Sequence, residues 1–258
     1  MSYFSFNGKS CKEFGLTVEA IPNFLSARRE TEVFQIPGKS GDFIHQNGRY
    51  ENLTQEYDVF LNPGDESYIA SAKKIANWLG NVNGYARLED DYDPDSFRLA
   101  YFSGPLDMTN WFRRKGRATL EFICRPQRYR KAGEEELTVS FGTPIVNSGM
   151  PAEPYVSITY PEITTNENTK TIILLNGKPW FTAKYMTFGG TVTVDTYTGK
   201  INSSAYKEYS IYFNADLDLK LEPGENIIEV QLQPCTGGSN TSDDHTPSVK
   251  IIPRWWDL

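Results

Sequence analysis

Hydrophobic and polar residues alternate along most of the first half of the chain. The alternation appears in seven runs, at residues 4–6, 16–18, 31–36, 56–61, 85–88, 97–102 and 117–124. Because successive side chains of a strand point to opposite faces, each run predicts a β-strand with one buried face. The first half is therefore predicted to be mainly β.

One segment follows the spacing of a helix instead. Between residues 67 and 79, apolar side chains recur at intervals of three and four, at Tyr68, Ile69, Ala72, Ile75, Ala76 and Leu79. This spacing predicts a single long helix with one buried face that lies across a sheet. Asp65 is expected to cap its start, and Gly80 to end it in a left-handed conformation.

The second half reads as one short strand after another. The expected strands are residues 154–160, 171–175, 179–183, 191–195, 209–213, 227–232 and 249–252. Asn176-Gly177 separates two of them and is typical of a tight hairpin turn. Many short strands separated by turns indicate a β-sandwich, and the polar stretch 235–247 is expected to be a surface loop.

Charge and composition divide the chain in two. Residues 131–136 are charged and lack apolar anchors, so they are the expected linker. Residues 1–133 hold 18 Lys and Arg against 17 Asp and Glu, whereas residues 134–258 hold 8 against 16. We therefore predict two domains, 1–133 and 134–258. The acidic second half argues against broad nucleic-acid binding, although simple solubility explains its charge equally well.

Composition also limits the class of protein. The chain has no apolar run long enough to span a membrane and no signal-peptide pattern at its start. Its three cysteines, Cys11, Cys124 and Cys235, are far apart in the sequence. They predict a reduced, cytosolic place of synthesis and neither a disulfide nor a zinc framework.

The turn-rich stretch between the strands at 31–36 and 56–61 contains the residues that best fit an interface. Pro37 to Asp42 is rich in turn formers, and Asn47-Gly48 is a second strong hairpin signal. Gly38-Lys39-Ser40 also resembles part of a phosphate-binding loop, but Val33 stands where that motif needs glycine. A hairpin tip explains the stretch better.

Other patterns that carry chemistry are incomplete. Asp91, Asp93 and Asp95 alternate as in a calcium loop, but its sixth and twelfth places are Ser96 and Phe102, which favours a solvated acidic turn. The two histidines, His45 and His245, lie in turn-rich stretches with no serine elbow to serve. We predict no enzyme, catalytic residue, metal or cofactor.

Two surface features leave alternatives open. Trp180 is a candidate platform for stacking a sugar, although a tryptophan after an Asn-Gly turn is more often packed inside. The basic clusters 113–117 and 125–131 are predicted to form a charged sheet rim or a polar subunit interface, with Asp107 and Glu121 as nearby partners. The final Trp255-Trp256 is expected to pack against the fold.

Four stretches together resemble the distal tail proteins of siphophages, mainly those that infect Gram-positive hosts. The stretches are Phe6-Asn7-Gly8-Lys9-Ser10 with Phe14-Gly15-Leu16; Ile36-Pro37-Gly38-Lys39-Ser40-Gly41-Asp42 with Tyr50-Glu51-Asn52; the helix ending Asn77-Trp78-Leu79 with Phe97-Arg98-Leu99-Ala100; and Leu221-Glu222-Pro223-Gly224-Glu225-Asn226 with Pro253-Arg254-Trp255-Trp256-Asp257-Leu258. They span nearly the whole chain in the family's order.

The resemblance implies a fold and an assembly. The first domain is expected to be a β-sandwich-like, ring-forming domain with one helix and a β-hairpin belt. The second is expected to be a galectin-like β-sandwich. Six copies would close into a ring, with the belt of each copy on its neighbour. The implied interface residues come from the turn-rich stretch, and are Ile36, Pro37, Gly38, Lys39, Asn47, Gly48 and Tyr50.

The implied function is a structural hub in the virion tail, assembled in the cytoplasm of a bacterial host. Its implied partners are further copies of the chain, the tail tube protein and the tail-tip protein, which is lysin-like. A receptor-binding protein or a host cell-wall saccharide is a further implied partner, and DNA is implied only as cargo in transit. Two other classes remain, a carbohydrate-binding module that uses Trp180 and a wall-degrading enzyme.

Overall fold

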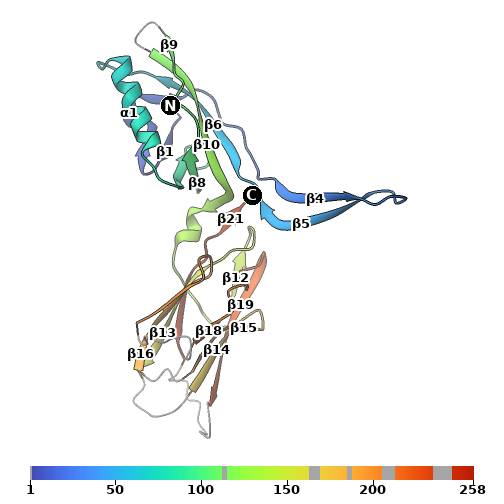
Figure 1. Ribbon diagram of the computed structural model, residues 1–258. Coiled ribbons are helices and arrows are strands. Elements are labelled where there is room, and N and C mark those ends of the chain that lie inside the picture. The colour runs from blue at the N-terminus through green and yellow to red at the C-terminus, as the bar shows by residue number, and fades with distance from the viewer. Residues whose placement is uncertain (1, 112–114, 163–168, 185–187, 205–212, 235–245) are drawn as a thin grey trace. The chain divides into compact units, whose positions relative to one another are not determined.

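The structure is a computed structural model that describes residues 2–111, 115–162, 169–184, 188–204, 213–234 and 246–258. The chain forms two compact units (Figure 1), the first of Met1–Tyr129 together with Leu258 and the second of Arg130–Asp257. The described residues are mainly β, which confirms the predicted fold class. The roles predicted for domains 1–133 and 134–258 remain predictions.

The first unit contains strands, one α-helix and a short 3-10 helix. Its strands are β1 (Phe4–Phe6), β2 (Lys9–Ser10), β3 (Leu16–Val18), β4 (Arg29–Gln35), β5 (Asp42–Tyr50), β6 (Leu53–Leu61), β7 (Ala86–Asp90), β8 (Ser96–Phe102), β9 (Thr109–Trp111) and β10 (Lys115–Arg130). Its helices are η1 (Cys11–Phe14) and α1 (Tyr68–Gly80). Each of the seven alternating runs of the first half lies in or overlaps one of these strands.

The main sheet of the first unit curls until its two ends meet. Its strands follow the order β2-β1-β7-β8-β10-β6-β3. An isolated antiparallel bridge joins Ser2, just before β1, to Val18 at the end of β3. The amide of Val18 donates to the carbonyl of Ser2 at 3.2 Å. Closure of this kind protects strand edges that would otherwise be free to pair.

Aromatic side chains fill the inside of this curled sheet. Phe4, Phe6 and Phe122 are fully buried, and Trp78 of α1 covers them. The ring of Trp78 stacks on Phe14 at 4.2 Å between centroids, and its Nε1 donates to the carbonyl of Phe6 at 3.2 Å. The helix is therefore attached to the sheet by packing and by one satisfied polar group.

The details of α1 differ from the sequence prediction. The cap at its start is Ser67, whose hydroxyl accepts from the amide of Ala70 at 3.2 Å. Gly80 is the last helical residue, and the C-cap is Asn81 with φ −91°, so no left-handed cap is present at this helix end. Ile69 is 64% exposed, whereas the unpredicted Trp78 is buried. The buried face of the helix includes Trp78 and leaves Ile69 exposed, because tryptophan has more apolar area to bury.

The second unit is a β-sandwich with a 3-10 helix at its start. Its elements are η2 (Lys131–Glu134), β11 (Leu137–Thr138), β12 (Pro144–Asn147), β13 (Tyr155–Glu162), β14 (Thr169–Leu175), β15 (Lys178–Lys184), β16 (Phe188–Asp195), β17 (Lys200–Ser203), β18 (Phe213–Ala215), β19 (Gly224–Pro234), β20 (Ser248–Ile252) and β21 (Trp256–Asp257). Two five-stranded sheets form the sandwich, in the orders β11-β20-β13-β16-β17 and β12-β19-β14-β15-β18.

The predicted hairpin around Asn176-Gly177 is confirmed. It joins β14 and β15, and both turn residues have positive φ angles, 52° and 76°, as a type I′ turn requires. Of the predicted strand 209–213, only Phe213 lies within the described residues. Most of the predicted loop 235–247 likewise lies outside them.

The expected linker is an ordered part of the second unit. Residues 131–134 form η2, and Gly133 is buried. The carbonyl of Gly133 accepts from the amide of Arg254 at 2.8 Å, and the amide of Arg130 donates to the carbonyl of Trp255 at 2.9 Å. The sequence prediction failed because the contact is made by the backbone of Gly133, which has no side chain to contribute an apolar signal.

The last residues of the chain pack as expected from their tryptophans. Trp255 is buried, and the Nε1 of Trp256 donates to the carbonyl of Pro151 at 3.0 Å. Arg254 bonds the carboxylate of Asp195 at 2.7 Å, and this bond holds the pKa of that carboxyl at about 2. The carboxylate of Asp257 accepts two bonds from Arg130. Side-chain ion pairs and backbone bonds therefore both fix this end of the chain.

Gly133→Ala should destabilise the second unit. A Cβ at this position would lie 2.4 Å from the backbone nitrogen of Trp255, which cannot move without breaking the bonds described above. Overpacking of this kind costs about 1–3 kcal/mol. Urea unfolding measures the loss. Gly104→Ala is the matched control, because a Cβ there meets nothing within 4 Å; equal stability of the two variants would contradict the account.

Asp195→Asn should lower stability at neutral pH by about 1–2 kcal/mol, because the variant loses the ion pair with Arg254. The pKa of Asp195 is lowered from 3.8 to about 2. A lowered folded pKa stabilises the protein above the unfolded pKa, and this stabilisation is lost as the pH falls toward 2. Unfolding at a series of pH values should show the gap between the two proteins closing from pH 4 downward. A constant gap would contradict this assignment.

Candidate interface at the β4–β5 hairpin

The strands β4 and β5 form a two-stranded sheet of their own. This hairpin stands clear of the curled sheet of its unit (Figure 1). Its tip is a turn in which the amide of Lys39 donates to the carbonyl of Ile36 at 3.1 Å. Pro37 and Gly38 occupy the middle of the turn, and Gly38 has φ +82°, which is the type II geometry that favours this pair. The predicted hairpin tip is confirmed.

The second hairpin signal, Asn47-Gly48, does not form a turn. Both residues lie inside β5. Arg29 pairs with Tyr50 and Thr31 with Gln46, so β5 advances four residues while β4 advances two. Asn47-Gly48 therefore belongs to a bulge. The turn at Pro37-Gly38 has already reversed the chain, and β4 extends far enough back to pair with residues beyond the bulge.

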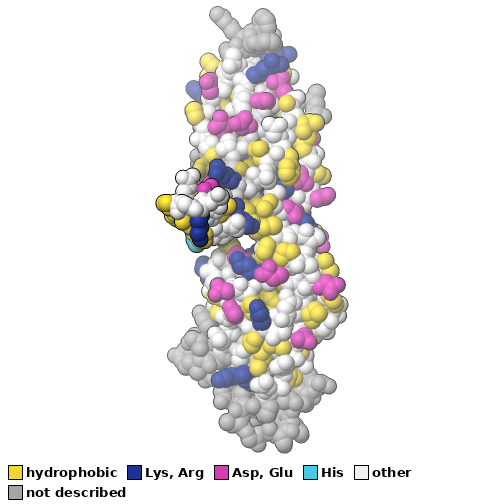
Figure 2. All heavy atoms as spheres, turned by 90° about the vertical axis from the view of Figure 1, so that its right-hand side faces the viewer, with side chains coloured by type: hydrophobic (Ala, Val, Ile, Leu, Met, Phe, Trp, Pro, Cys, Tyr) yellow, Lys and Arg dark blue, Asp and Glu magenta, His cyan; other side chains and the backbone are white. Residues whose placement is uncertain are grey.

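The hairpin exposes hydrophobic side chains on both of its faces. Val33 pairs with Ile44 on one face, and Phe34 pairs with Phe43 on the other. All four are between 50% and 58% exposed, and Ile36 near the tip is 43% exposed. In Figure 2 the hairpin points toward the viewer, with hydrophobic side chains open beside basic ones. A monomeric protein rarely leaves adjacent apolar pairs in water unless they bind something.

Polar contacts hold the base of the hairpin. The guanidinium of Arg29 donates to Gln46 Oε1 and to the hydroxyl of Tyr50, both at 2.6 Å. Arg49 pairs with Glu30 at 3.2 Å on the same part of the ribbon. These contacts are exposed, so each contributes little free energy, but together they keep the two strands in register near the main sheet.

The predicted interface residues thus separate into two groups. Ile36, Pro37, Gly38 and Lys39 lie at the tip, whereas Asn47, Gly48 and Tyr50 lie at the bulge and the base. The exposed apolar pairs between them were not among the predicted residues. The sequence did carry a signal for them, because Val33-Phe34 and Phe43-Ile44 each place two bulky apolar residues side by side, which a half-buried strand does not need.

Several arginines of the basic clusters are paired with carboxylates. Arg117 bonds Glu19 at 2.8 Å, and Arg128 bonds Asp93 at 2.7 Å. Arg113 and Arg114 lie outside the described residues, and Asp107 and Glu121 stay predicted partners of the clusters. Asp93 lies in the acidic turn between β7 and β8, and this turn is held by protein groups, including the amide of Tyr3, which donates to Asp91 at 3.0 Å.

The candidate sugar platform at Trp180, an alternative that the sequence left open, is ruled out by the structure. Trp180 is 1% exposed and lies inside the sandwich, with its ring centroid 4.4 Å from that of Phe181. A sugar stacks on an exposed ring face, and the ring of Trp180 has none. Trp180 belongs to the hydrophobic core of the second unit, the alternative that its place after an Asn-Gly turn favours.

Other candidate chemistry is not gathered into a centre. His45 lies on the hairpin opposite Glu32, and His245 lies outside the described residues. Within the described residues, no group of three or more His, Cys, Asp or Glu side chains is placed to hold a metal ion. Burial raises the pKa of the Cys124 thiol to about 12, so this cysteine is held as an inert thiol in the core. Among the described helices, none has the length and hydropathy needed to cross a bilayer.

Comparison with protein families identifies the first unit. Residues 9–124 match the family model of the phage tail protein RIFT-related domain. This range covers α1, the hairpin and the curled sheet except β1 and the end of β10. The comparison with curated proteins found no match.

One solved structure shares the fold over both units. The structure of the Dit protein of phage SPP1, described as a paradigm of the hub adsorption apparatus in phages that infect Gram-positive hosts, aligns with a TM-score of 0.69 and 15% identity. The alignment covers 97% of each chain. Two structures of the phage p2 baseplate in its activated conformation, with Ca and with Sr, align at 10% identity, with 97% of each chain covered and TM-scores of 0.44 and 0.47.

The first unit therefore matches a phage tail protein domain, and the chain as a whole shares the fold of the SPP1 Dit protein. Its resemblance to siphophage distal tail proteins is confirmed by the matching domain at residues 9–124 and by the shared fold over the full length. The hairpin with exposed apolar pairs lies within the matched domain.

Trp180→Ala should lower the stability of the second unit, because Trp180 is a core residue and not part of a sugar-binding surface. Removing a fully buried tryptophan costs about 3–5 kcal/mol. Thermal unfolding measures the loss. Tyr197→Ala, at an exposed aromatic of the same unit, is the control and should change stability by less than about 0.5 kcal/mol. Unchanged stability of Trp180→Ala would contradict the core assignment.

Proposed function

We propose that the chain is the structural hub of a siphophage tail tip. Six copies close into a ring through their first units, and the ring joins the tail tube to the tail-tip host-adhesion device. The open centre of the ring is a channel through which DNA passes. The observation that carries the proposal is the hairpin, which stands apart from the main sheet and exposes apolar pairs on both faces.

A lone two-stranded ribbon is at best marginally stable in water. The presence of this hairpin therefore supports the proposal that it binds a partner. Two strands cannot bury their side chains against each other, and each strand keeps one unpaired edge. A partner surface would cover the pair Phe34–Phe43 or the pair Val33–Ile44 and would exclude water from it. The closing of edges across subunits also limits open-ended aggregation.

A protruding hairpin favours a ring over a two-fold dimer. In the proposed ring, the hairpin of one copy binds a different surface on the next copy, as the resemblance to siphophage distal tail proteins implies. Such head-to-tail contacts form rings when the rotation between copies closes, and filaments when it does not. The number six comes from the resemblance to siphophage distal tail proteins. The likeness to the SPP1 Dit protein, described as a paradigm of a hub adsorption apparatus, supports the hub role.

The partners follow from this role. The ring has two open ends, one for the tail tube protein and one for the lysin-like tail-tip protein. The second units are free to contact a receptor-binding protein or a host cell-wall saccharide. Assembly in the cytoplasm of a bacterial host before virion release fits the buried, unbridged cysteines Cys11 and Cys124. The proposed role is mechanical and involves no reaction.

Polar substitutions on the hairpin should break the ring. Val33→Ser with Ile44→Ser removes the apolar pair of one face, and Phe34→Ser with Phe43→Ser removes that of the other. At least one double variant should shift the mass from about six times 29.3 kDa to that of one chain. Light scattering on a size-exclusion column, at two protein concentrations, measures this shift.

The control removes exposed apolar side chains from the second unit. Val146→Ser with Tyr197→Ser alters residues that are 63% and 50% exposed, and the ring should persist. A ring that survives both hairpin variants would show that the hairpin is not the interface. A wild-type chain that stays monomeric at both concentrations would contradict the hexamer.

A further inference from the structure

The hairpin is connected to the curled sheet by a segment without regular structure. This segment, residues 19–28, is called the strap here; it runs from the end of β3 to the start of β4. Backbone bonds fix its two ends, from the amide of Glu19 to the carbonyl of Asp58 and from the amide of Glu51 to the carbonyl of Arg28, both at 2.8 Å. Between them the strap is largely exposed, with Phe24 at 73%.

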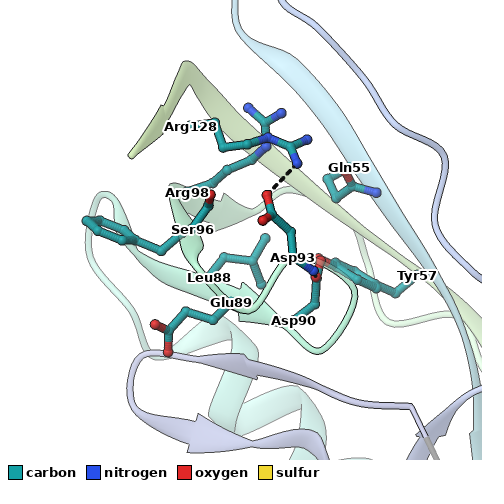
Figure 3. Close-up of a pocket in the computed structure, with 10 residues that line it drawn as sticks. Gln55, Tyr57, Leu88, Glu89, Asp90, Asp93, Ser96, Arg98 and Arg128 are labelled. Atoms are coloured by element: carbon teal, nitrogen blue, oxygen red, sulfur yellow. Dashed lines mark hydrogen bonds and ion pairs between the residues drawn. The ribbon is translucent and has the colours of Figure 1, made fainter. Parts of the chain in front are cut away.

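A buried arginine of the main sheet holds the middle of the strap. Arg98 of β8 is 6% exposed, and its Nη2 donates to the carbonyl of Leu25 at 2.8 Å. Figure 3 shows Arg98 beside Arg128 in a pocket lined by β6, β7, β8 and β10. The pocket has a volume of about 30 Å³, enough for a water molecule and too small for an organic ligand. The contact of Arg98 is therefore directed at the strap.

A second arginine adds a cation–π contact to the same part of the strap. The guanidinium of Arg128 lies 4.6 Å from the ring centroid of Phe24. Its Nη1 donates to Asp93 at 2.7 Å, and this bond fixes the direction of the guanidinium (Figure 3). Asp90, next to the turn, accepts from the hydroxyl of Tyr57 at 2.7 Å, and Glu89 pairs with Arg87 at 2.9 Å. Each carboxylate of the pocket thus has a partner other than Arg98, whose Nη2 bonds the strap carbonyl.

The environment of Arg98 is unfavourable for its charge. Burial lowers the pKa of Arg98, and the nearby positive charge of Arg128 lowers it further. Among the described protein groups, none accepts a hydrogen bond from the Nη1 of Arg98, which lies beside this pocket. A buried charge with incomplete partners seldom stabilises a fold, and an apolar residue of similar size is often as stable or more so. The arginine is therefore poorly explained by the stability of the sheet alone.

We propose that Arg98 is a positioning residue, which latches the strap to the sheet and so fixes the direction in which the hairpin leaves the first unit. The inference rests on the hub proposed above, because a ring closes only if each hairpin meets its neighbour at one angle. Fixing the strap before assembly removes part of the entropy that ordering it would otherwise cost on binding. The latch thereby favours ring formation without contacting the neighbouring copy.

Replacement of Arg98 separates the latch from the stability of the fold. In Arg98→Met, cleavage of the strap after Phe24 by chymotrypsin under native conditions should become at least about tenfold faster, measured on unassembled chains at low concentration. The unfolding temperature should stay equal or rise, because a desolvated charge has been removed. The protein concentration needed for half assembly should rise roughly tenfold. Arg98→Lys keeps a donor and a charge, so its strap opening and its assembly concentration should both lie between those of the wild type and Arg98→Met.

The control lowers stability in the same pocket without touching the strap. Leu88→Ala opens a cavity in the neighbouring strand β7, so it should lower the unfolding temperature and leave the rate of native-state cleavage in the strap unchanged. An unchanged rate of strap cleavage in Arg98→Met would overturn the latch. So would a ring that forms at the wild-type concentration despite a loosened strap. A ring that is lost in the hairpin variants but kept in Arg98→Met would remove this inference alone and leave the hub standing.

Discussion

A two-stranded ribbon has no interior, so the hairpin of the first unit cannot bury its own apolar side chains. The cross-strand pairs Val33–Ile44 and Phe34–Phe43 lie on opposite faces of the hairpin, so folding of the chain cannot bury both. The curled sheet behind the hairpin is closed by the bridge between Ser2 and Val18 and offers few open edges. The hairpin therefore has adjacent apolar pairs and strand edges that remain to be covered by another molecule.

The rest of the first unit gives the hairpin a firm support. Trp78 of α1 covers the buried phenylalanines of the sheet, and the sheet in turn carries Arg98 and Arg128 on neighbouring strands. These arginines contact the strap, and the strap leads into the hairpin. Support of this kind matters for a ring, because a small error in the angle of each contact is multiplied around the circle.

Most strands and the single long helix could be predicted from residue patterns, because their burial follows periods of two and 3.6. The bulge at Asn47-Gly48 could not be predicted, because the turn at Pro37-Gly38 had already reversed the chain. The ordered segment at Gly133 was also missed, because its contact uses backbone atoms. Trp180 was correctly weighed as a core residue against a sugar platform, and only its burial decided between them. Arg98 lies in a stretch that carries the family resemblance, but its contact with the strap could not be predicted, because its partner is a backbone carbonyl 73 residues away.

Electron microscopy of the assembled chain tests the central claim most directly. Class averages of negatively stained particles should show a closed ring with six equal subunits and an open centre. Open filaments, two-fold dimers or single chains as the main species would contradict the account, because the hairpin would then lack the neighbour that its exposed pairs require.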